Sequence, residues 1–584
     1  MPYAGLVGRN RLGYFVCLAT QLTYAKGVSM DRRRFLELAG LGAAAVTGGS
    51  LLAGCGAAKG GGGPGTTDQS QLQKVLPAYV PSAAVQPDIP SVQGANGFFS
   101  MPAFLSYPSS PVATVTGTPG KGGSYTAKTP LWGAIPPSTG NTYYDTVNAA
   151  LGATVKMQPA DGVNYDKVLP TLFAGDKLPD WLMIPSWNMT NLGFSGAVTK
   201  FTDLGPYLSG DAVKAYPNLA AIPSSAWQCC IWNGKLYGLP TYYSGANPGG
   251  AFFYRKDIFD QHGISADSIK TPADLEAVAK QLTDAKAGHW AFGDFFDYLG
   301  QIFHFPGEPN KWSLDASGKL IHRYEMPQYL DALSWFQKQA KAGYVHPDAL
   351  AGKTDEGKQR FWSGKEIITA DGVGAWKGDD AQSGKAANPS YNRQAFKPMS
   401  VDGKPRLDMT PSAGMYSFLS GKLSADQIKE CLSIANYLAA PFGSTEYLTV
   451  NFGKEGVDYT MKDSNPTLTE KGSKEVATTY QFLVTPVSPT TVIVGQTQVA
   501  KDYAAWEGDM VKYAAKPVFY GMNITEPTQF ASLNQPMVDV SKDVRYGRKP
   551  VSAFQEALKT WKAQGGDQLR AFYEDIRTKY GTGQ

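Results

Sequence analysis

Large aromatic side chains, with amide and carboxylate groups beside them, follow several short apolar runs of this 584-residue chain. Trp132 lies within the run at 129–135, and Trp187 and Asn188 follow the run at 181–184. The other members of the set are Tyr242 and Tyr243 after residues 239–240, and Phe295, Asp297 and Tyr298 after a later run. Aromatic rings stack on apolar ring faces, and Asp and Asn bind hydroxyl groups, so this chemistry suits a polyhydroxylated ligand such as a sugar.

Each of these side chains also has a structural interpretation. In a chain with 12% aromatic residues, Trp, Tyr and Phe commonly pack in cores, and Asp297 could cap a local turn. For Trp187 the position indicates ligand contact, because a loop after a strand offers little core in which an indole could be buried. Ligands of open parallel sheets bind at the carboxyl ends of the strands, where these loops would lie.

The local signatures of several enzyme classes are missing from the sequence. It contains no G-x-S-x-G, no H-E-x-x-H, no P-loop and no G-x-G-x-x-G after a strand. With five histidines and no Cys/His group at metal spacing, we expect neither a metal site nor a cofactor. A carboxylate pair for glycoside cleavage has no characteristic spacing, so a secreted glycan hydrolase or lyase remains the alternative.

The net charge of +4 is located in the first 54 residues, which hold six basic and two acidic side chains. The rest of the chain has 48 of each, so it offers no electrostatic footprint for nucleic acid. Its length and its 43% hydrophobic content allow three to five domains or one large two-lobed body.

Residues 30–55 have the pattern of an export signal. An arginine cluster at 32–34 is followed by an uncharged Ala/Gly/Leu run at 38–54 that is too weak for a good membrane-spanning helix. The cluster resembles the twin-arginine motif, while Asp31 and Glu37 leave the general secretory route open. Residues 52–55, Leu-Ala-Gly-Cys, resemble the lipobox of bacterial lipoproteins, which implies lipidation of Cys55 and an anchor at the outer face of the cell membrane. We expect Met30 to be the true start, with residues 1–29 upstream of it.

Three cysteines lie beyond residue 55, namely Cys229, Cys230 and Cys431. Cys431 falls on the apolar face of a predicted helix, which favours a buried thiol. A disulfide from Cys431 to Cys229 or Cys230 is the alternative.

Alternating strand and helix patterns begin near residue 126. Strands are predicted at 129–135, 153–157 and 181–184, and helices at 143–151 and 165–174, which is typical of an α/β fold with a parallel sheet. Thr271, Ser424 and Ser552 each stand three residues before an acid or amide and predict helix caps. Residues 55–125 are rich in Gly and Pro, so we expect a lipid-anchored flexible tether at 60–63 followed by an extended segment.

Five segments, in order, resemble the extracellular solute-binding proteins of ABC importers, specifically the maltose-binding-like family 1 and its lipoprotein branch. These segments are GDKLPD at 175–180, NGKLYGLP at 233–240, YRKDIF at 254–259, FWSGKEIITADGVGAW at 361–376 and FGKEGVDY at 452–459. Each segment alone is weakly specific, but their order behind a lipobox is not. Residues 56–125, 377–400 and 485–535 are covered less well.

The resemblance implies an α/β, two-lobed periplasmic-binding-protein-like (type II) fold, with a hinge and a central ligand cleft. Lobe 1 would comprise 126–248 and 405–450, and lobe 2 would comprise 249–404 and 451–584. Trp376 matches the tryptophan that stacks on a sugar ring in sugar-binding members. The implied protein is a monomeric, non-enzymatic receptor that delivers a solute, expected to be a carbohydrate, to the permease subunits of an ABC transporter. A surface lipoprotein that signals ligand occupancy without a transporter is a further alternative, and neighbouring permease genes would decide against it.

Overall fold

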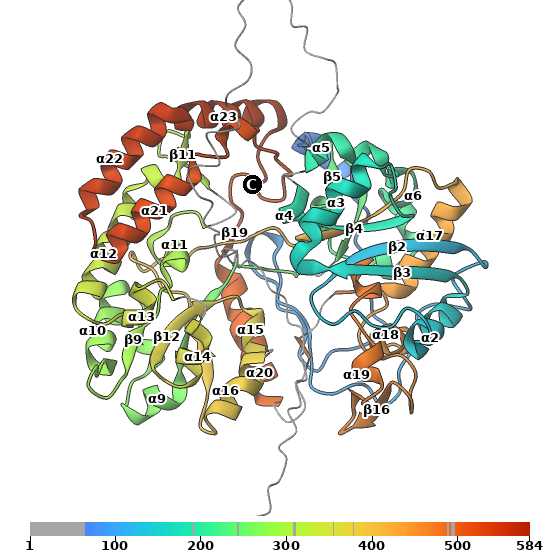
Figure 1. The fold of residues 1–584 in the computed structure, drawn as a ribbon, viewed down its shortest axis with the longest axis horizontal. Coiled ribbons are helices and arrows are strands. Elements are labelled where there is room, and N and C mark those ends of the chain that lie inside the picture. The colour runs from blue at the N-terminus through green and yellow to red at the C-terminus, as the bar shows by residue number, and fades with distance from the viewer. Residues whose placement is uncertain are drawn as a thin grey trace, which may run out of the picture.

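The computed structural model describes residues 65–189, 192–241, 244–307, 311–353, 356–377, 379–487, 490–491 and 497–584. The expected export signal, Cys55, the tether at 60–63, Tyr242 and Tyr243 lie outside the described residues. Two α/β lobes lie side by side (Figure 1), which confirms the predicted two-lobed α/β class.

Lobe 1 is built on a five-stranded sheet with the order β3-β2-β4-β15-β7. Its strands are β2 (Ser124–Leu131), β3 (Thr154–Asp161), β4 (Trp181–Pro185), β7 (Gly238–Thr241) and β15 (Met415–Leu419). Strand β2 runs parallel to β3 and β4, whereas β15 is antiparallel to β4 and β7. The helices α2 (Thr142–Leu151), α3 (Tyr165–Ala174), α17 (Ala425–Leu438) and α18 (Thr445–Phe452) contribute to the same apolar core. The predicted helices at 143–151 and 165–174 are therefore confirmed to within one residue.

Lobe 2 is built on a four-stranded sheet with the order β13-β8-β12-β9. Its strands are β8 (Ala251–Arg255), β9 (Trp290–Phe292), β12 (Glu366–Asp371) and β13 (Arg393–Ala395). Its main helices are α9 (Lys256–Gln261), α10 (Pro272–Leu282), α12 (Pro327–Lys341), α14 (Gly357–Trp362), α21 (Asn534–Arg545), α22 (Val551–Trp561) and α23 (Asp567–Tyr580). A second apolar core lies between this sheet and helices that include α10, α12, α21 and α22.

The crossings between the lobes orient the two sheets. The chain leaves lobe 1 at the carboxyl end of β7 and enters lobe 2 at the start of β8, where Ala251 pairs with Asp371 at the carboxyl end of β12. The return crossing enters lobe 1 at the start of β15, where Met415 pairs with Pro185 at the carboxyl end of β4. The carboxyl ends of β4, β7 and β12 therefore all lie on the side of the hinge, where open sheets bind ligands.

A small hinge cluster lies between the lobes. Strand β14 (Leu407–Asp408) of the return crossing pairs with β19 (Ala514–Ala515). The buried members of the cluster are Phe98, Ala246, Leu407, Met409, Met510, Val511, Ala514 and Tyr520. The hinge is therefore a packed apolar unit and not a pair of solvated linkers.

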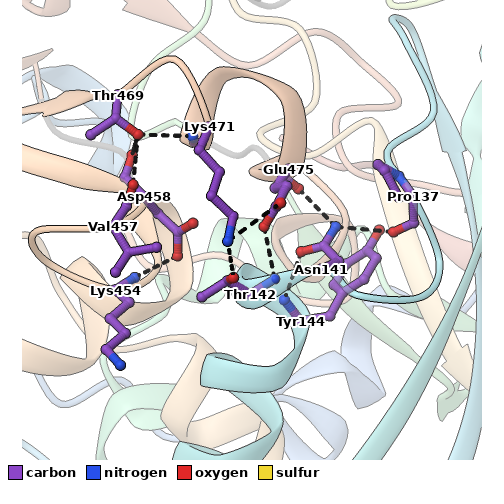
Figure 2. A network of polar contacts seen from close by, with 11 residues as sticks. Pro137, Asn141, Thr142, Tyr144, Lys454, Val457, Asp458, Thr469, Lys471 and Glu475 are labelled. Carbon is purple, nitrogen blue, oxygen red and sulfur yellow. Dashed lines mark hydrogen bonds and ion pairs between the residues drawn. The ribbon is translucent and has the colours of Figure 1, made fainter.

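Residues 451–484, which the sequence analysis placed with lobe 2, pack here with lobe 1. Helix α19 (Gly472–Glu475) lies against the start of α2, where the Glu475 carboxylate accepts a hydrogen bond from the Thr142 N–H at 2.7 Å (Figure 2). The Lys471 ammonium donates to Thr142 Oγ1 at 2.5 Å in the same network. The helix dipole stabilises the Glu475 carboxylate at this helix N-terminus. Further along the same segment, Tyr480 is fully buried in the lobe 1 core.

Residues 65–123 hold little regular structure and contact both lobes. In Figure 1 this segment, in blue, passes between the lobes. The Tyr107 hydroxyl donates to the Ser444 carbonyl of lobe 1 at 2.6 Å. The Met101 N–H donates at 3.1 Å to the buried Glu507 of α20 (Thr497–Met510), a helix that packs against lobe 2. Buried aromatic residues such as Phe98 hold the segment in place.

Helix caps follow the sequence at two of the three predicted positions. Thr271 and Ser424 form complete capping boxes at the starts of α10 and α17. The prediction for Ser552 is wrong, because α22 begins at Val551 with Pro550 at its N-cap position, which puts Ser552 inside the first turn. The proline ring restricts the backbone of residue 550 at the helix boundary, and α22 begins there without a side-chain cap.

Among the described residues, Cys229, Cys230 and Cys431 are buried free thiols. The described part of the chain shows no group of three or more His, Cys, Asp or Glu side chains placed to hold a metal ion. Within the same residues, no helix is long and apolar enough to cross a membrane.

Candidate ligand-binding site

Two indole rings form an aromatic platform at the carboxyl ends of the lobe 1 strands. Trp132 follows β2, and Trp187 lies in the short helix α4 (Ser186–Met189) that follows β4. Their ring centroids are 6.1 Å apart at an interplanar angle of 51°. The Trp132 ring packs against Phe482, with 5.6 Å between the ring centroids. It also packs against the backbone of Gly162 after β3, so closely that a Cβ atom on residue 162 would lie 2.6 Å from the indole. Trp187 is 52% exposed, so it presents apolar ring surface to solvent.

Asn188 lies beside this platform but is itself buried. Among the described residues its side-chain oxygen accepts no hydrogen bond. A buried amide oxygen without a donor is costly, and this one is shielded from solvent in the present conformation. The structure therefore brings together Trp132 and Trp187 of the predicted set, and Asn188 follows Trp187 in the same short helix.

Lobe 2 contains a cavity of about 820 Å³ at the carboxyl ends of β9 and β12. Asp297 and Tyr298 line it from the turn after β9, and Gln301 lines it from α11 (Gly300–Phe303). Residues of the hinge crossings, including Gly249 and Arg406, border it. The volume is in the range of pockets that hold a small ligand or part of an oligosaccharide. Its position beside the hinge places it on the lobe face that would close on a ligand.

The two other predicted aromatic contacts lie in the interior of lobe 2. Phe295 is 1% exposed and packs against Phe252 and Phe292 in the core. Trp376, in α15 (Gly374–Lys377), is 2% exposed and packs against Phe253 and Tyr503. This differs from the predicted stacking role, because neighbouring rings already surround both side chains in this conformation. Asp297 and Tyr298 are the members of the lobe 2 set that reach the cavity.

Ion pairs between distant parts of the chain shape the cavity wall. Arg545 at the end of α21 is 2.7 Å from Asp294 and 3.6 Å from Asp297. Burial opposes the charge of Arg545, but the two carboxylates raise its pKa above the ordinary value, so it stays cationic. The Tyr546 hydroxyl also donates to Asp294 at 2.5 Å. These contacts fix the loop after β9 against α21.

Burial dominates the pKa of Glu366, which lies at the start of β12. It is 1% exposed, and burial raises its pKa to about 7 even though Arg360 lies 2.5 Å away. Burial also raises the pKa of Tyr298, with a contribution from Asp371, so its hydroxyl remains a donor near neutral pH. The wall therefore contains donors, acceptors and one carboxyl group that titrates near neutrality.

Sequence patterns did not identify the arginines of this cavity. Arg545 and its partner Asp294 are 251 residues apart, and neither belongs to a local motif. The remaining cavity arginines are Arg323, Arg360, Arg393, Arg406 and Arg548. Arg360 directly precedes the 361–376 segment that carries part of the family resemblance, so this segment is a local signal near Arg360.

Comparison with known proteins assigns the architecture to a family. The family model described as bacterial extracellular solute-binding protein matches residues 142–453. The chain belongs to the bacterial extracellular solute-binding proteins. The match spans β3, β4, β7, β8, β9, β12 and β15, and therefore covers most of both sheets and both hinge crossings.

Two curated relatives from Bacillus subtilis (strain 168) support this assignment. The polygalacturonan/rhamnogalacturonan-binding protein YtcQ is 23% identical over 441 residues, which covers 71% of this chain and 83% of YtcQ. Lipoprotein LipO is 22% identical over 468 residues and covers 75% of this chain and 89% of LipO. Both relatives are named as a binding protein or a lipoprotein and not as an enzyme.

The alginate-binding protein AlgQ2, solved without calcium ion, has the same fold. It superposes with a TM-score of 0.53 at 14% identity, covering 78% of this chain and 97% of AlgQ2. At this identity the likeness concerns the fold alone, and it agrees with the two-lobed arrangement described above.

Proposed function

We propose that this solute-binding protein captures an oligosaccharide between its lobes and delivers it to the permease subunits of an ABC importer. The observation that carries the proposal is the pairing of two surfaces on the hinge side. Lobe 1 presents the exposed indole of Trp187, and lobe 2 presents an 820 Å³ cavity rich in hydrogen-bonding groups. An aromatic face on one lobe and a polar cavity on the other match the apolar C–H face and hydroxyl rim of a sugar.

The names of the relatives agree with this ligand class. YtcQ is named for binding polygalacturonan and rhamnogalacturonan, and AlgQ2 for binding alginate, all of which are polysaccharides. A chain of several sugar rings could extend from the platform toward the cavity. The proposed sugar contacts are Trp132, Trp187, Asn188, Asp297 and Tyr298. Tyr242 and Tyr243, on the crossing from β7, also remain proposed contacts.

We further propose that Cys55 carries the lipid that holds the protein at the outer face of the cell membrane. Residues 52–55 support this, as does the lipoprotein relative LipO. Replacing Cys55 with Ser should release the protein from the membrane fraction, because the serine hydroxyl does not replace the thiol as the lipid acceptor. Retention of the Ser variant in membranes would contradict the anchor.

Thermal unfolding of the chain from residue 56 onward, with a panel of mono- and oligosaccharides, tests the ligand class. A ligand at 100 times its Kd adds about 2.7 kcal/mol to the free energy of unfolding, which raises Tm by a few degrees in a protein of this size. Recovery of the sugar unchanged is expected for a receptor. A sugar that is recovered cleaved would show a hydrolase or lyase, and the absence of any shift across the panel would exclude a carbohydrate receptor.

A further inference from the structure

The lobe 2 cavity concentrates positive charge in a chain that is otherwise balanced. Beyond residue 54 the chain has 48 basic and 48 acidic residues. Among the described residues that line the cavity, eight are Lys or Arg and five are Asp or Glu, an excess of three positive charges. A neutral sugar does not need this excess, and cations that face one cavity repel one another when no anion is present.

The carboxylates of the wall are largely committed to arginines of the wall. Besides the pairs Asp294–Arg545 and Glu366–Arg360, Arg393 is 3.6 Å from Asp371, and Arg406 is 2.9 Å from Asp408. These pairs keep the carboxylates from neutralising further cations. They also hold guanidinium groups in fixed positions before a ligand arrives, which lowers the entropy cost of binding.

The surplus cations lie toward the outside of the cavity. Lys542 of α21 and Lys358 of α14 are both exposed, and within the described part of the chain neither forms an ion pair. Arg548 is 52% exposed and shares Asp543 with Lys549. A ligand that enters from solvent would therefore meet these ammonium groups first and the buried, paired Arg360, Arg393 and Arg545 deeper inside.

We propose that the cavity binds an anionic oligosaccharide, whose carboxylate or sulfate groups are held by these basic side chains. This inference rests on the proposed oligosaccharide function and specifies its ligand. Guanidinium groups bind carboxylate and sulfate oxygens through paired N–H donors, and ammonium groups add charge without strict geometry. Tyr298 and Gln301 in the same wall would bind the sugar hydroxyls.

Calorimetric titration of the chain from residue 56 onward tests the proposal with matched ligands. Tetragalacturonate and its fully methyl-esterified form have the same rings, but only the free acid carries charge. We expect the ester to bind at least about tenfold more weakly, because charge-assisted hydrogen bonds are lost. Affinity for the acid should also fall as salt rises from about 0.05 to 0.5 M, since partly exposed charges are screened.

A sulfated oligosaccharide without uronate, from κ-carrageenan, separates the two anionic groups. Binding of tetragalacturonate identifies carboxylate as the recognised group, and selective binding of the sulfated sugar identifies sulfate. Equal binding of acid and ester, or preference for the neutral maltotetraose, would overturn the anionic ligand while leaving the oligosaccharide receptor intact. If none of these sugars binds, both proposals fail.

A matched pair of variants locates the binding to this cavity. Lys542→Gln removes an unpaired cation of the cavity, whereas Lys559→Gln removes a 73% exposed lysine of α22 that does not line it. We expect the first variant to weaken binding of the anionic sugar about two- to fivefold and to reduce its salt dependence. Lys559→Gln should change neither. Because both positions are exposed on helices, neither substitution should unfold the protein. Identical affinities of the two variants for the anionic sugar would exclude the cavity as the anion site.

Discussion

The aromatic platform of lobe 1 depends on two indoles that come from different strand ends. Trp187 is half-exposed and Trp132 is wedged between Phe482 and Gly162, so the pair combines an open ring with a fixed one. Rigid aromatic side chains lose little entropy when they bind, and they contribute much of the binding energy at sugar and protein surfaces. Trp187 is therefore the residue whose loss should affect ligand binding most directly.

Replacing Trp187 with Ala should weaken oligosaccharide binding about tenfold and should change the free energy of unfolding little, because the ring is 52% exposed. Titration calorimetry and urea unfolding measure the two effects. Trp376→Ala is the contrasting variant, since its ring is 2% exposed and its removal should cost about 3–5 kcal/mol of stability. An unchanged affinity in the Trp187 variant would remove it from the site.

Glu366 should give the stability of the protein an unusual dependence on pH. Burial raises the pKa of Glu366 from 4.5 to about 7, so the folded protein keeps this proton at pH values where the unfolded chain has lost it. The free energy of unfolding should therefore fall as pH rises from about 4.5 to about 7, by at most about 3 kcal/mol. Glu366→Gln should flatten this part of the profile.

The measurement is Tm against pH for the native protein and the Glu366→Gln variant. The variant should lose stability mainly above about pH 7, where native Glu366 is charged beside Arg360, so the slope is the quantity compared. Glu470→Gln, at an 89% exposed position, serves as the control and should keep the native slope. Parallel profiles for all three proteins would show that Glu366 titrates normally.

At the scale of single residues, the sequence identified the side chains that local patterns position. Trp132, Trp187 and Asn188 could be placed because each lies next to a short apolar run. Arg545 could not, because its role depends on Asp294, which lies 251 residues away. Trp376 matched a family motif, but its burial depends on Tyr503 of a helix that no local pattern brings near it.

Helix starts show the same limit at the scale of elements. The capping boxes at Thr271 and Ser424 were predictable, because both partners of each box lie within four residues. At Ser552 the same spacing is present, but Pro550 ends the preceding loop and moves the helix start. Spacing alone does not specify which of two adjacent boundary signals determines the first turn.

Ser424→Ala should lower the free energy of unfolding by about 1 kcal/mol, because the Gln427 N–H loses its acceptor. Ser552→Ala should change it by less than about 0.5 kcal/mol, since the exposed hydroxyl caps nothing. Urea unfolding of both variants provides the comparison, with the same m-value expected for each. A loss of about 1 kcal/mol at Ser552 would restore it as the cap of α22.

At the scale of the whole molecule, the alternation of strands and helices predicted the α/β class and the family resemblance predicted two lobes, but residues 451–484 were assigned to the other lobe. Residues 451–484 return to lobe 1 because Glu475 and Lys471 contact Thr142, a long-range network that local periodicity does not contain. The segment at 65–123 is likewise fixed by single contacts to distant residues, such as that between Tyr107 and Ser444. Topology of this kind depends on specific side-chain pairs and not on composition.

Ligand binding should bring the lobes together, with the hinge cluster around Met409 and Ala514 as the pivot. A compact chain of about 530 residues has a radius of gyration near 24 Å, and closure should reduce the value measured by small-angle X-ray scattering when saturating ligand is added. The segment at 65–123 must change shape during this motion, because it is hydrogen-bonded to both sides. Met101 donates to Glu507 beside lobe 2, and Tyr107 donates to Ser444 of lobe 1. The Trp187→Ala variant at a ligand concentration below its Kd should keep the larger radius. An unchanged radius in the saturated native protein would mean that the ligand binds to one lobe without closing the hinge.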